Sequence, residues 1–270
     1  MKNQLKYTLT KHFFKTIGLT SKGIRLCYQH GLTSGKMLDY IYENKPTGNW
    51  MVGKSLDRYF LNHPGWEAIR VRRRHLEQLL ATAINNLAAN QLPINILDVA
   101  SGPAAYILSS ITKSTYKHDI QAVCQDIDQR WLDEGQAAAS AQGLTKVTYQ
   151  QGNAYDLQNI IASGFNPTII IASGFYDWVT DDNRVKESLK LNYETLADNG
   201  YFILSNQISH PDLEMVQSVF VDFDQNPLRM TMRPQNQFDT WLGDTGFTIK
   251  QCLTCPNNYF SVTLTQKVQH

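Results

Sequence analysis

From Pro93 onward, short apolar runs alternate with helical stretches, and this alternation constrains the fold more than any other feature of the sequence. Apolar runs bounded by turn residues are typical of buried strands. The predicted strands cover residues 94–100, 119–126, 146–152, 167–174 and 201–207, and the predicted helices begin near residues 104, 129 and 183. Because parallel strands need helical crossovers between them, the pattern predicts an α/β fold with a parallel sheet covered on both faces.

The alternation stops at the end of the chain. Residues 247–255 and 259–268 read as two strands, and only Pro256, Asn257 and Asn258 separate them. A connection this short joins antiparallel strands. We therefore predict a Rossmann-like, mostly parallel seven-stranded sheet that ends in an antiparallel hairpin.

Residues 1–90 have a different pattern, with helical stretches at 34–43 and 66–89 joined by a segment rich in Gly, Pro and Asn. We predict two domains, an N-terminal helical cover at 1–90 and an α/β domain at 91–270. The cover is expected to pack over the carboxyl ends of the strands, where open α/β sheets bind ligands.

The composition is that of a globular protein in a reducing compartment. Apolar residues make up 42% of the chain and charged residues 18%, and the net charge is +1. The balance of charge gives no general attraction to nucleic acid, and no apolar run reaches the roughly 20 residues of a membrane span. Four cysteines are too few for a disulfide framework, and the lone C-x-x-C at Cys252 and Cys255 lies in a predicted strand, where zinc binding is not expected. We predict a cytoplasmic protein without a metal.

The segment "ILDVASGPAAY" carries the main indication of a ligand site. Asp98 ends the first predicted strand, and a loop of small residues follows. Small residues let a ligand approach the backbone, and Gly102 is the position where a positive φ is expected; Ala100 and Ala104 are expected to have ordinary backbone angles. An aspartate before this loop suits a cationic ligand better than a phosphate.

The next two strands end in similar polar residues. Asp126 suits two ribose hydroxyls, and Asn153 with Ala154 suits the edge of a purine. Each aspartate alone is explained equally well as a helix cap. The ordered set across three neighbouring strand ends is more specific than any one member.

With these motifs, the sequence resembles the class I S-adenosylmethionine-dependent methyltransferases over residues 94–268. "LDVASGPAAY" stands where that family has its acidic, glycine-rich loop, "CQDID" matches the ribose-binding position and "GNAYD" the adenine-side position. Other segments, among them "SNQISHPDLE", resemble a bacterial group of methyltransferases in which this module can follow an α/β-hydrolase domain. The resemblance implies S-adenosylmethionine as cofactor. The expected cofactor-binding residues are Asp98, Ala100, Ser101, Gly102, Tyr106, Asp126, Ile127, Asn153, Ala154 and Ser173.

The methyl acceptor is expected to meet residues after the fourth and fifth strands. The candidates are Ser173, Tyr176, Asp177, Trp178, Asn206, Gln207 and His210. We predict catalytic roles for His210 as a general base, for Tyr176, and for Arg233 as a clamp for an anionic group. Alternatively, His210 lies in the opening of a helix capped by Ser209, and Arg233 forms a structural ion pair.

The expected substrate is a small molecule, with an anionic or lipid-like part, and nucleic acid is not an expected partner. The run "RVRRRH" at residues 70–75 is better explained as a helix face with ion pairs, because Glu67 and Glu77 lie nearby. Two alternatives are an NAD(P)-dependent oxidoreductase and a cofactor-binding module without catalysis.

The N-terminal segment 1–20 raises the question of peripheral membrane contact. Leu5, Leu9, Phe13 and Ile17 recur every four residues among lysines, as in basic amphipathic helices that bind anionic bilayers. The same face is equally suited to packing against the protein core.

Overall fold

The computed structural model describes residues 2–32, 34–222 and 224–268. Their contacts divide the chain into two compact units: unit 1 contains residues 1–71 and 210–230, and unit 2 contains residues 72–209 and 231–270. This division differs from the predicted boundary near residue 90. Helix α5 (Pro64–Ala89) continues without a break across residue 71, and its second part supplies apolar residues to the core of unit 2.

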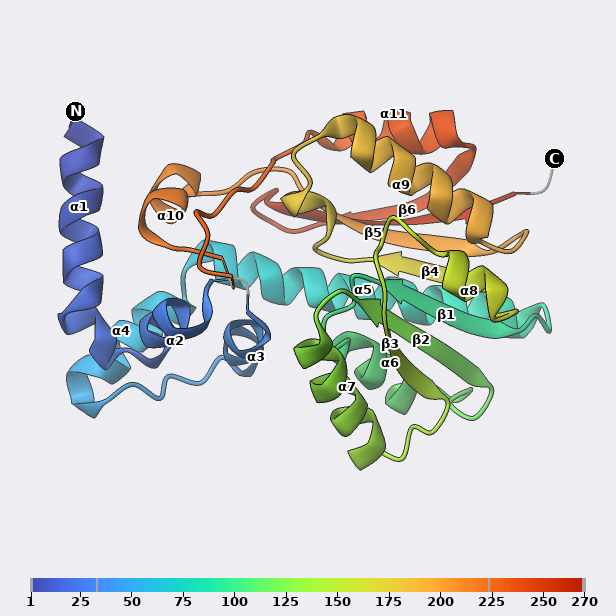
Figure 1. The fold of residues 1–270 in the computed structure, drawn as a ribbon, viewed down its shortest axis with the longest axis horizontal. Helices are drawn as coiled ribbons and strands as arrows, with labels where there is room; N and C mark the ends of the chain where they lie inside the picture. Colours follow the sequence, from blue (N-terminus) through green and yellow to red (C-terminus); the bar gives the residue numbers. More distant parts are fainter. Residues whose placement is uncertain (1, 33, 223, 269–270) are drawn as a thin grey trace. The chain divides into compact units, whose positions relative to one another are not determined.

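Unit 2 is built on a seven-stranded sheet in the order β3-β2-β1-β4-β5-β7-β6 (Figure 1). Its strands are β1 (Ile94–Val99), β2 (Ile120–Asp126), β3 (Val147–Gln151), β4 (Ile169–Ala172), β5 (Tyr201–Gln207), β6 (Phe247–Thr254) and β7 (Phe260–Lys267). Strands β1 to β5 pair in parallel, and β7 pairs antiparallel with both β5 and β6. The predicted parallel sheet with a terminal hairpin is thus confirmed, and the last strand of the chain inserts between β5 and β6.

Helices cover both faces of this sheet. Those that follow strands are α6 (Ala105–Lys113), α7 (Gln129–Ala141), α8 (Gln158–Ala162), the 3-10 turn η2 (Tyr176–Trp178), α9 (Asp182–Thr195) and α11 (Gln235–Thr245). The core on one face joins α5, α6 and α7 to the strands, and the core on the other face joins α8, η2, α9 and α11 to them. A sheet buried on both faces explains why β4 is apolar throughout.

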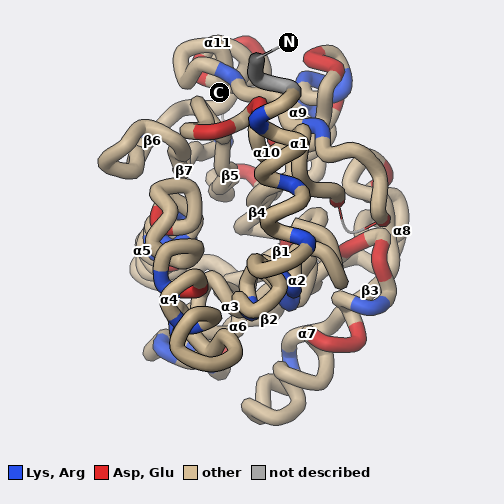
Figure 2. The backbone as a smooth tube through the Cα atoms, turned by 90° about the vertical axis from the view of Figure 1, so that its left-hand side faces the viewer, with Lys and Arg blue, Asp and Glu red and all other residues tan. Residues whose placement is uncertain are grey.

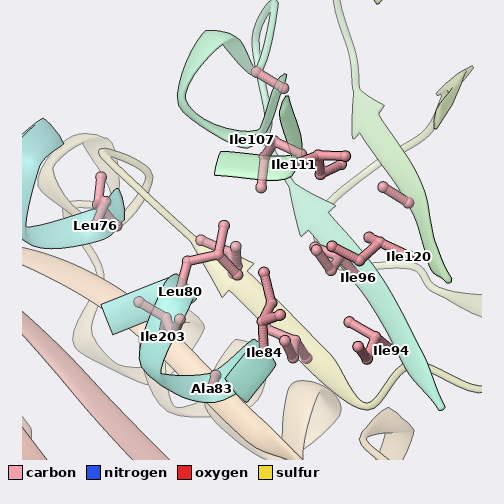
Figure 3. Close-up of a cluster of buried hydrophobic side chains, with 14 of the residues drawn as sticks. Leu76, Leu80, Ala83, Ile84, Ile94, Ile96, Ile107, Ile111, Ile120 and Ile203 are labelled. Atoms are coloured by element: carbon pink, nitrogen blue, oxygen red, sulfur yellow. The ribbon is translucent and has the colours of Figure 1, made fainter. Parts of the chain in front are cut away.

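The first of these cores contains more buried residues than the second. Figure 3 shows part of it. Leucines and an isoleucine spaced four apart on α5, Leu76, Leu80 and Ile84, face the sheet, which presents residues such as Ile96 and Ile203. The spacing places them on one side of the helix, so α5 buries a continuous apolar stripe against the strands.

Unit 1 is helical. It contains α1 (Lys2–Lys15), the 3-10 turn η1 (Ile17–Thr20), α2 (Lys22–His30), α3 (Gly35–Glu43), α4 (Trp50–Leu61), the start of α5, and α10 (Leu213–Val219). Its core includes Cys27, Met37, Ile41, Leu61 and Phe220. Residues 210–230 therefore return to a helical unit that otherwise comes from the first 71 residues.

Candidate active site

The loop after β1 has an unusual backbone. Ala100, Gly102 and Ala104 all have left-handed conformations, with φ of 55°, 54° and 53°. The prediction of ordinary angles for the two alanines was wrong. Two hydrogen bonds fix the loop in this shape: the Ser101 N–H donates to the Gln125 carbonyl at 3.0 Å, and the Gly102 N–H donates to Asp126 Oδ2 at 2.7 Å. A left-handed alanine costs about 1–2 kcal/mol, so neighbouring structure holds this loop in a strained form.

Gly102 is the part of the loop that a ligand could approach most closely. A Cβ at this position would meet no atom of the described structure within 4 Å. The loop backbone therefore faces open space here.

Asp98, on β1, is a buried carboxyl group with an exposed fraction of 0%. The Tyr106 hydroxyl donates to its Oδ2 at 2.7 Å, whereas its Oδ1 has no hydrogen-bond partner in the described part of the chain. Burial raises the pKa of Asp98 to about 8; the hydrogen bond from Tyr106 opposes this effect, and the charge of Asp126 adds to it. A buried carboxyl with a free oxygen is prepared to receive a cationic or hydrogen-bond-donating group.

Asp126, at the end of β2, connects two loops. Besides accepting from Gly102, it accepts the Asp128 N–H through Oδ1 at 3.0 Å. The carboxylate is half-buried, and each oxygen keeps a lone pair for a further donor. The alternative of helix capping does not apply to either aspartate, because the N-cap of α6 is Ala104 and that of α7 is Asp128.

The end of β3 lies beside that of β2, since Asp126 is in register with Gln151. The Gln125 side-chain amide donates to the Asn153 carbonyl at 3.1 Å, and Asn153 Oδ1 accepts the Tyr155 N–H at 3.0 Å. Ala154 is buried next to this turn. The predicted sequence of strand ends, β1, β2 and β3, is therefore contiguous in space.

Ile127 and Ser173 flank this edge. Ile127 follows Asp126 directly and is 69% exposed. Ser173 follows β4, the neighbour of β1 on its other side, and is half-buried.

The polar atoms of two predicted catalytic residues have structural partners. Tyr176 is fully buried, and its hydroxyl lies 3.2 Å from Ser188 Oγ and 3.4 Å from Asn192 Nδ2 on α9. Arg233, 2% exposed, donates to Asp182 Oδ1, to the Tyr176 carbonyl and to the Val179 carbonyl. These contacts match the structural alternative for Arg233, and the catalytic roles of Tyr176 and Arg233 stay predictions.

His210 belongs to unit 1 and is half-buried. Its Nδ1 accepts the Asp212 N–H at 3.1 Å, and His63 Nε2 lies 2.9 Å from Asp212 Oδ2. Burial, together with the charge of His63, lowers the pKa of His210 to about 4, so the ring is neutral at pH 7. The expected cap at Ser209 is not formed, because α10 begins after Asp212. The catalytic role of His210 stays a prediction.

Arg72 is the polar residue of this edge that the sequence did not reveal. It is 8% exposed, its Nη1 lies 3.6 Å from Asp177 Oδ2, and its guanidinium lies 4.8 Å from the centre of the Phe260 ring. Asp177 also accepts the Gln207 N–H at 3.0 Å. One signal was present: Arg72 stands four residues before Leu76 and continues the buried stripe of α5.

Two buried atoms of this cluster lack partners within the described ranges, Arg72 Nε and Gln207 Oε1. Burial raises the pKa of Asp177 to about 6, although Arg72 and the Gln207 N–H oppose the shift. Burying a polar atom without a hydrogen bond is costly, and buried groups with shifted pKa values cluster at functional sites. The cluster lies at the ends of β4 and β5, where an acceptor was expected.

Comparison with known proteins assigns this chain to a family. A family model described as "Putative methyltransferase" matches residues 1–267. A protein of Escherichia coli (strain K12), "Uncharacterized protein YnbC", is 31% identical over 245 residues, which are 90% of this chain and 42% of that protein. The chain thus spans less than half the length of this curated relative.

Solved structures share the fold at low sequence identity. A "possible exported protein" from Bordetella parapertussis has a TM-score of 0.70 and 19% identity over 91% of this chain and 83% of its own. Magnesium protoporphyrin IX methyltransferase from Synechocystis PCC 6803, solved with bound SAH, has a TM-score of 0.58 and 13% identity over 97% and 99%. The chain belongs to the family described as "Putative methyltransferase", and its fold is the Rossmann-like fold of the class I methyltransferases.

Proposed function

We propose that this chain is an S-adenosylmethionine-dependent methyltransferase that acts on a small molecule. The observation that carries the proposal is the buried Asp98 with its unpartnered Oδ1, placed beside Asp126 and the open backbone of Gly102. Family membership and the SAM- and SAH-bound structural neighbours support the same cofactor.

The residues present fit this cofactor. Asp98 would receive the ammonium group of the amino-acid part, and Asp126 the two ribose hydroxyls. Ile127 offers an exposed apolar side chain for the adenine, and Asn153 and Ala154 follow on the next strand. The bound cofactor would supply an electrophilic methyl carbon on a sulfonium.

The same features disfavour a dinucleotide. The pyrophosphate of NAD binds at the glycine-rich loop and the N-terminus of the next helix. Here that loop lies between two carboxyl groups, Asp98 and Asp126, which would repel phosphate when ionised.

On the acceptor side, we assign Ser173, Asp177 and Gln207 to the substrate pocket. The unpartnered Gln207 Oε1 can accept a hydrogen bond from the acceptor, and Arg72 holds Asp177 in place. Methyl transfer requires alignment of the acceptor and exclusion of water more than acid–base chemistry.

Calorimetry with S-adenosylmethionine, S-adenosylhomocysteine and NAD tests the proposal. We expect binding of the first two, and we expect Asp126→Ala to weaken it by about a hundredfold, because two hydrogen bonds of about 1.5 kcal/mol each are lost. The matched control is Asp133→Ala, which removes an exposed carboxylate from α7. Its affinity should equal that of the wild type.

Three results would contradict the proposal. Tight NAD binding without response to the sulfonium ligand would favour the oxidoreductase. Unchanged affinity in Asp126→Ala would remove the assigned site. Binding without methyl release across a broad panel of acceptors would indicate a module without catalysis.

A further inference from the structure

Helix α1 has two apolar faces, and only one of them is packed. Tyr7 and Phe14 lie against the core of unit 1, and the Tyr7 hydroxyl donates to Glu214 on α10 at 3.0 Å. On a different face, Leu5 is 66%, Leu9 62% and Phe13 40% exposed. The alternative that this second face packs against the protein core is thereby excluded within the described residues.

Further apolar residues are exposed on η1 and at the start of α4. Ile17 of η1 is 55% exposed, and Trp50, Met51 and Val52 are 81%, 86% and 57% exposed. The Asn49 N–H donates to the Thr20 carbonyl at 2.8 Å, so the start of α4 is joined to η1. We call Leu5, Leu9, Phe13, Ile17, Trp50, Met51 and Val52 the α1–α4 surface.

The start of α4 packs closely against η1 and has a strained backbone at Trp50. A Cβ on Gly48 or Gly53 would collide with backbone atoms of this junction, so the two segments pack backbone against backbone. Trp50 has a left-handed conformation with φ of 52°, which is costly for a residue other than glycine. Strained backbone conformations cluster at functional sites, and large exposed apolar patches mark interaction surfaces.

The charges around this surface indicate its partner. Residues 1–38 contain seven Lys and Arg and no Asp or Glu. Lys6, Lys11, Lys15 and Lys54 are exposed, and Figure 2 shows Lys and Arg recurring along α1. Exposed apolar side chains that include a tryptophan, together with lysines, match the boundary between the headgroups and acyl chains of an anionic bilayer.

We propose that the α1–α4 surface binds anionic membranes peripherally. In the described residues, no helix is long and apolar enough to cross a bilayer, so contact at the interface is the mode that fits. The proposal rests on exposure and charge in unit 1 and does not depend on the function proposed for unit 2. The main rival occupant is a second copy of the chain. Pairing two such surfaces would place the lysines of both copies against each other, and like charges repel.

Sedimentation of the full-length chain with lipid vesicles tests the proposal. Vesicles of phosphatidylcholine are compared with vesicles that also contain phosphatidylglycerol, at low and high salt. We expect binding to the anionic vesicles, weakened by salt because exposed charges are screened. Leu5→Glu combined with Leu9→Glu should reduce partitioning at least about tenfold, since two apolar contacts are lost and two lysines neutralised.

Two further variants keep the test specific. Leu92→Glu combined with Ile161→Glu changes two exposed apolar residues of unit 2 by the same charge, and it should partition as the wild type does. Trp50→Ser tests the α4 part of the surface without altering α1, and it too should reduce partitioning. Equal melting temperatures show that the variants are folded.

Two outcomes would overturn the proposal. The first is equal sedimentation of the wild type and the Leu5/Leu9 variant with anionic vesicles, including no sedimentation of either. The second is a wild-type dimer that the Leu5/Leu9 variant converts to monomer while vesicle binding is unchanged, which would identify a second copy as the occupant.

Discussion

At the scale of single residues, Asp98 makes the site sensitive to pH. Its pKa is raised by burial to about 8, so at neutral pH the carboxyl is largely protonated in the free protein. The unfolded chain has a value near 3.8, and the proton is therefore bound more tightly in the folded state. By linkage, the stability from this group is present below pH 3.8 and is lost as the pH rises through about 8.

A cationic ligand reverses this preference because it favours the ionised carboxylate. We expect the affinity for S-adenosylmethionine to increase between pH 6 and pH 8, by at most about tenfold per pH unit. Asp98→Asn should bind more weakly at pH 8 and should lose this dependence, since the amide still accepts from Tyr106 but carries no charge. Calorimetry across the pH range measures both effects.

The same variant supplies a second readout without ligand. Its melting temperature relative to the wild type should rise from pH 5 to pH 8, because the asparagine has no proton to lose. If the affinity of the wild type and that of Asp98→Asn change in parallel with pH, the assignment of Asp98 to the cationic group is wrong.

The loop after β1 shows what a sequence reveals about single residues. The positions of Asp98 and Asp126 were predictable, because each directly ends an apolar run that reads as a strand. The backbone of Ala100 and Ala104 was not, since local preference favours ordinary angles for alanine. The hydrogen bonds of Ser101 and Gly102 to the end of β2 override that preference, and they join segments distant in the sequence.

At the scale of elements, Arg72 connects helix α5 to η2 and to strand β7. It faces Asp177 of η2 and lies over the ring of Phe260 on β7. Removal of one member of a buried ion pair leaves the other charge without compensation, which commonly costs about 3–5 kcal/mol. Replacement of both by uncharged groups of similar size costs much less.

We therefore expect strong coupling in a double-mutant cycle. Asp177→Asn and Arg72→Met should each lower the free energy of unfolding by about 3 kcal/mol, and the double variant should recover most of the loss. The asparagine can still accept from the Gln207 N–H, so that contact is preserved. Urea unfolding of the four proteins measures the coupling, and additive losses would show that the two side chains do not interact.

The helices and strands of unit 2 were largely predictable from the sequence, because its sheet is buried on both faces. Strands buried on both faces give continuous apolar runs, and the crossovers give helices of regular length. The sequence did not predict that β7, rather than β6, pairs with β5. A hairpin fixes the pairing between its own two strands, but it does not determine which of them joins the rest of the sheet. Arg72 was hidden for a related reason: a run of arginines reads as a solvated face, whichever member turns inward.

At the scale of the whole molecule, the two units of the structure have other boundaries than the two domains predicted from the sequence. Residues 210–230 belong to the same unit as the helices of the first 71 residues. No local sequence pattern predicts that this segment packs with helices so distant in the sequence. Unit 1 has its own polar centre at Asp57, which is fully buried. It accepts hydrogen bonds from the Ser21 hydroxyl, the Gly23 N–H, the Tyr40 hydroxyl and the Thr47 N–H, at 2.5, 2.9, 2.5 and 3.0 Å.

Asp57 connects α2, α3 and α4, and within the described residues it makes no hydrogen bond outside unit 1. Its loss should therefore affect the two units unequally. Asp57→Ala leaves four donors without their acceptor, and we expect it to destabilise unit 1 by about 3–5 kcal/mol. Hydrogen exchange should then show lost protection in residues 21–61, while β1, β4 and β5 keep theirs. Asp133→Ala, an exposed carboxylate on α7, is the control and should change neither region. If the strands lose protection together with the helices, the two units unfold as one cooperative body, and binding of the cofactor would then stabilise unit 1 as well.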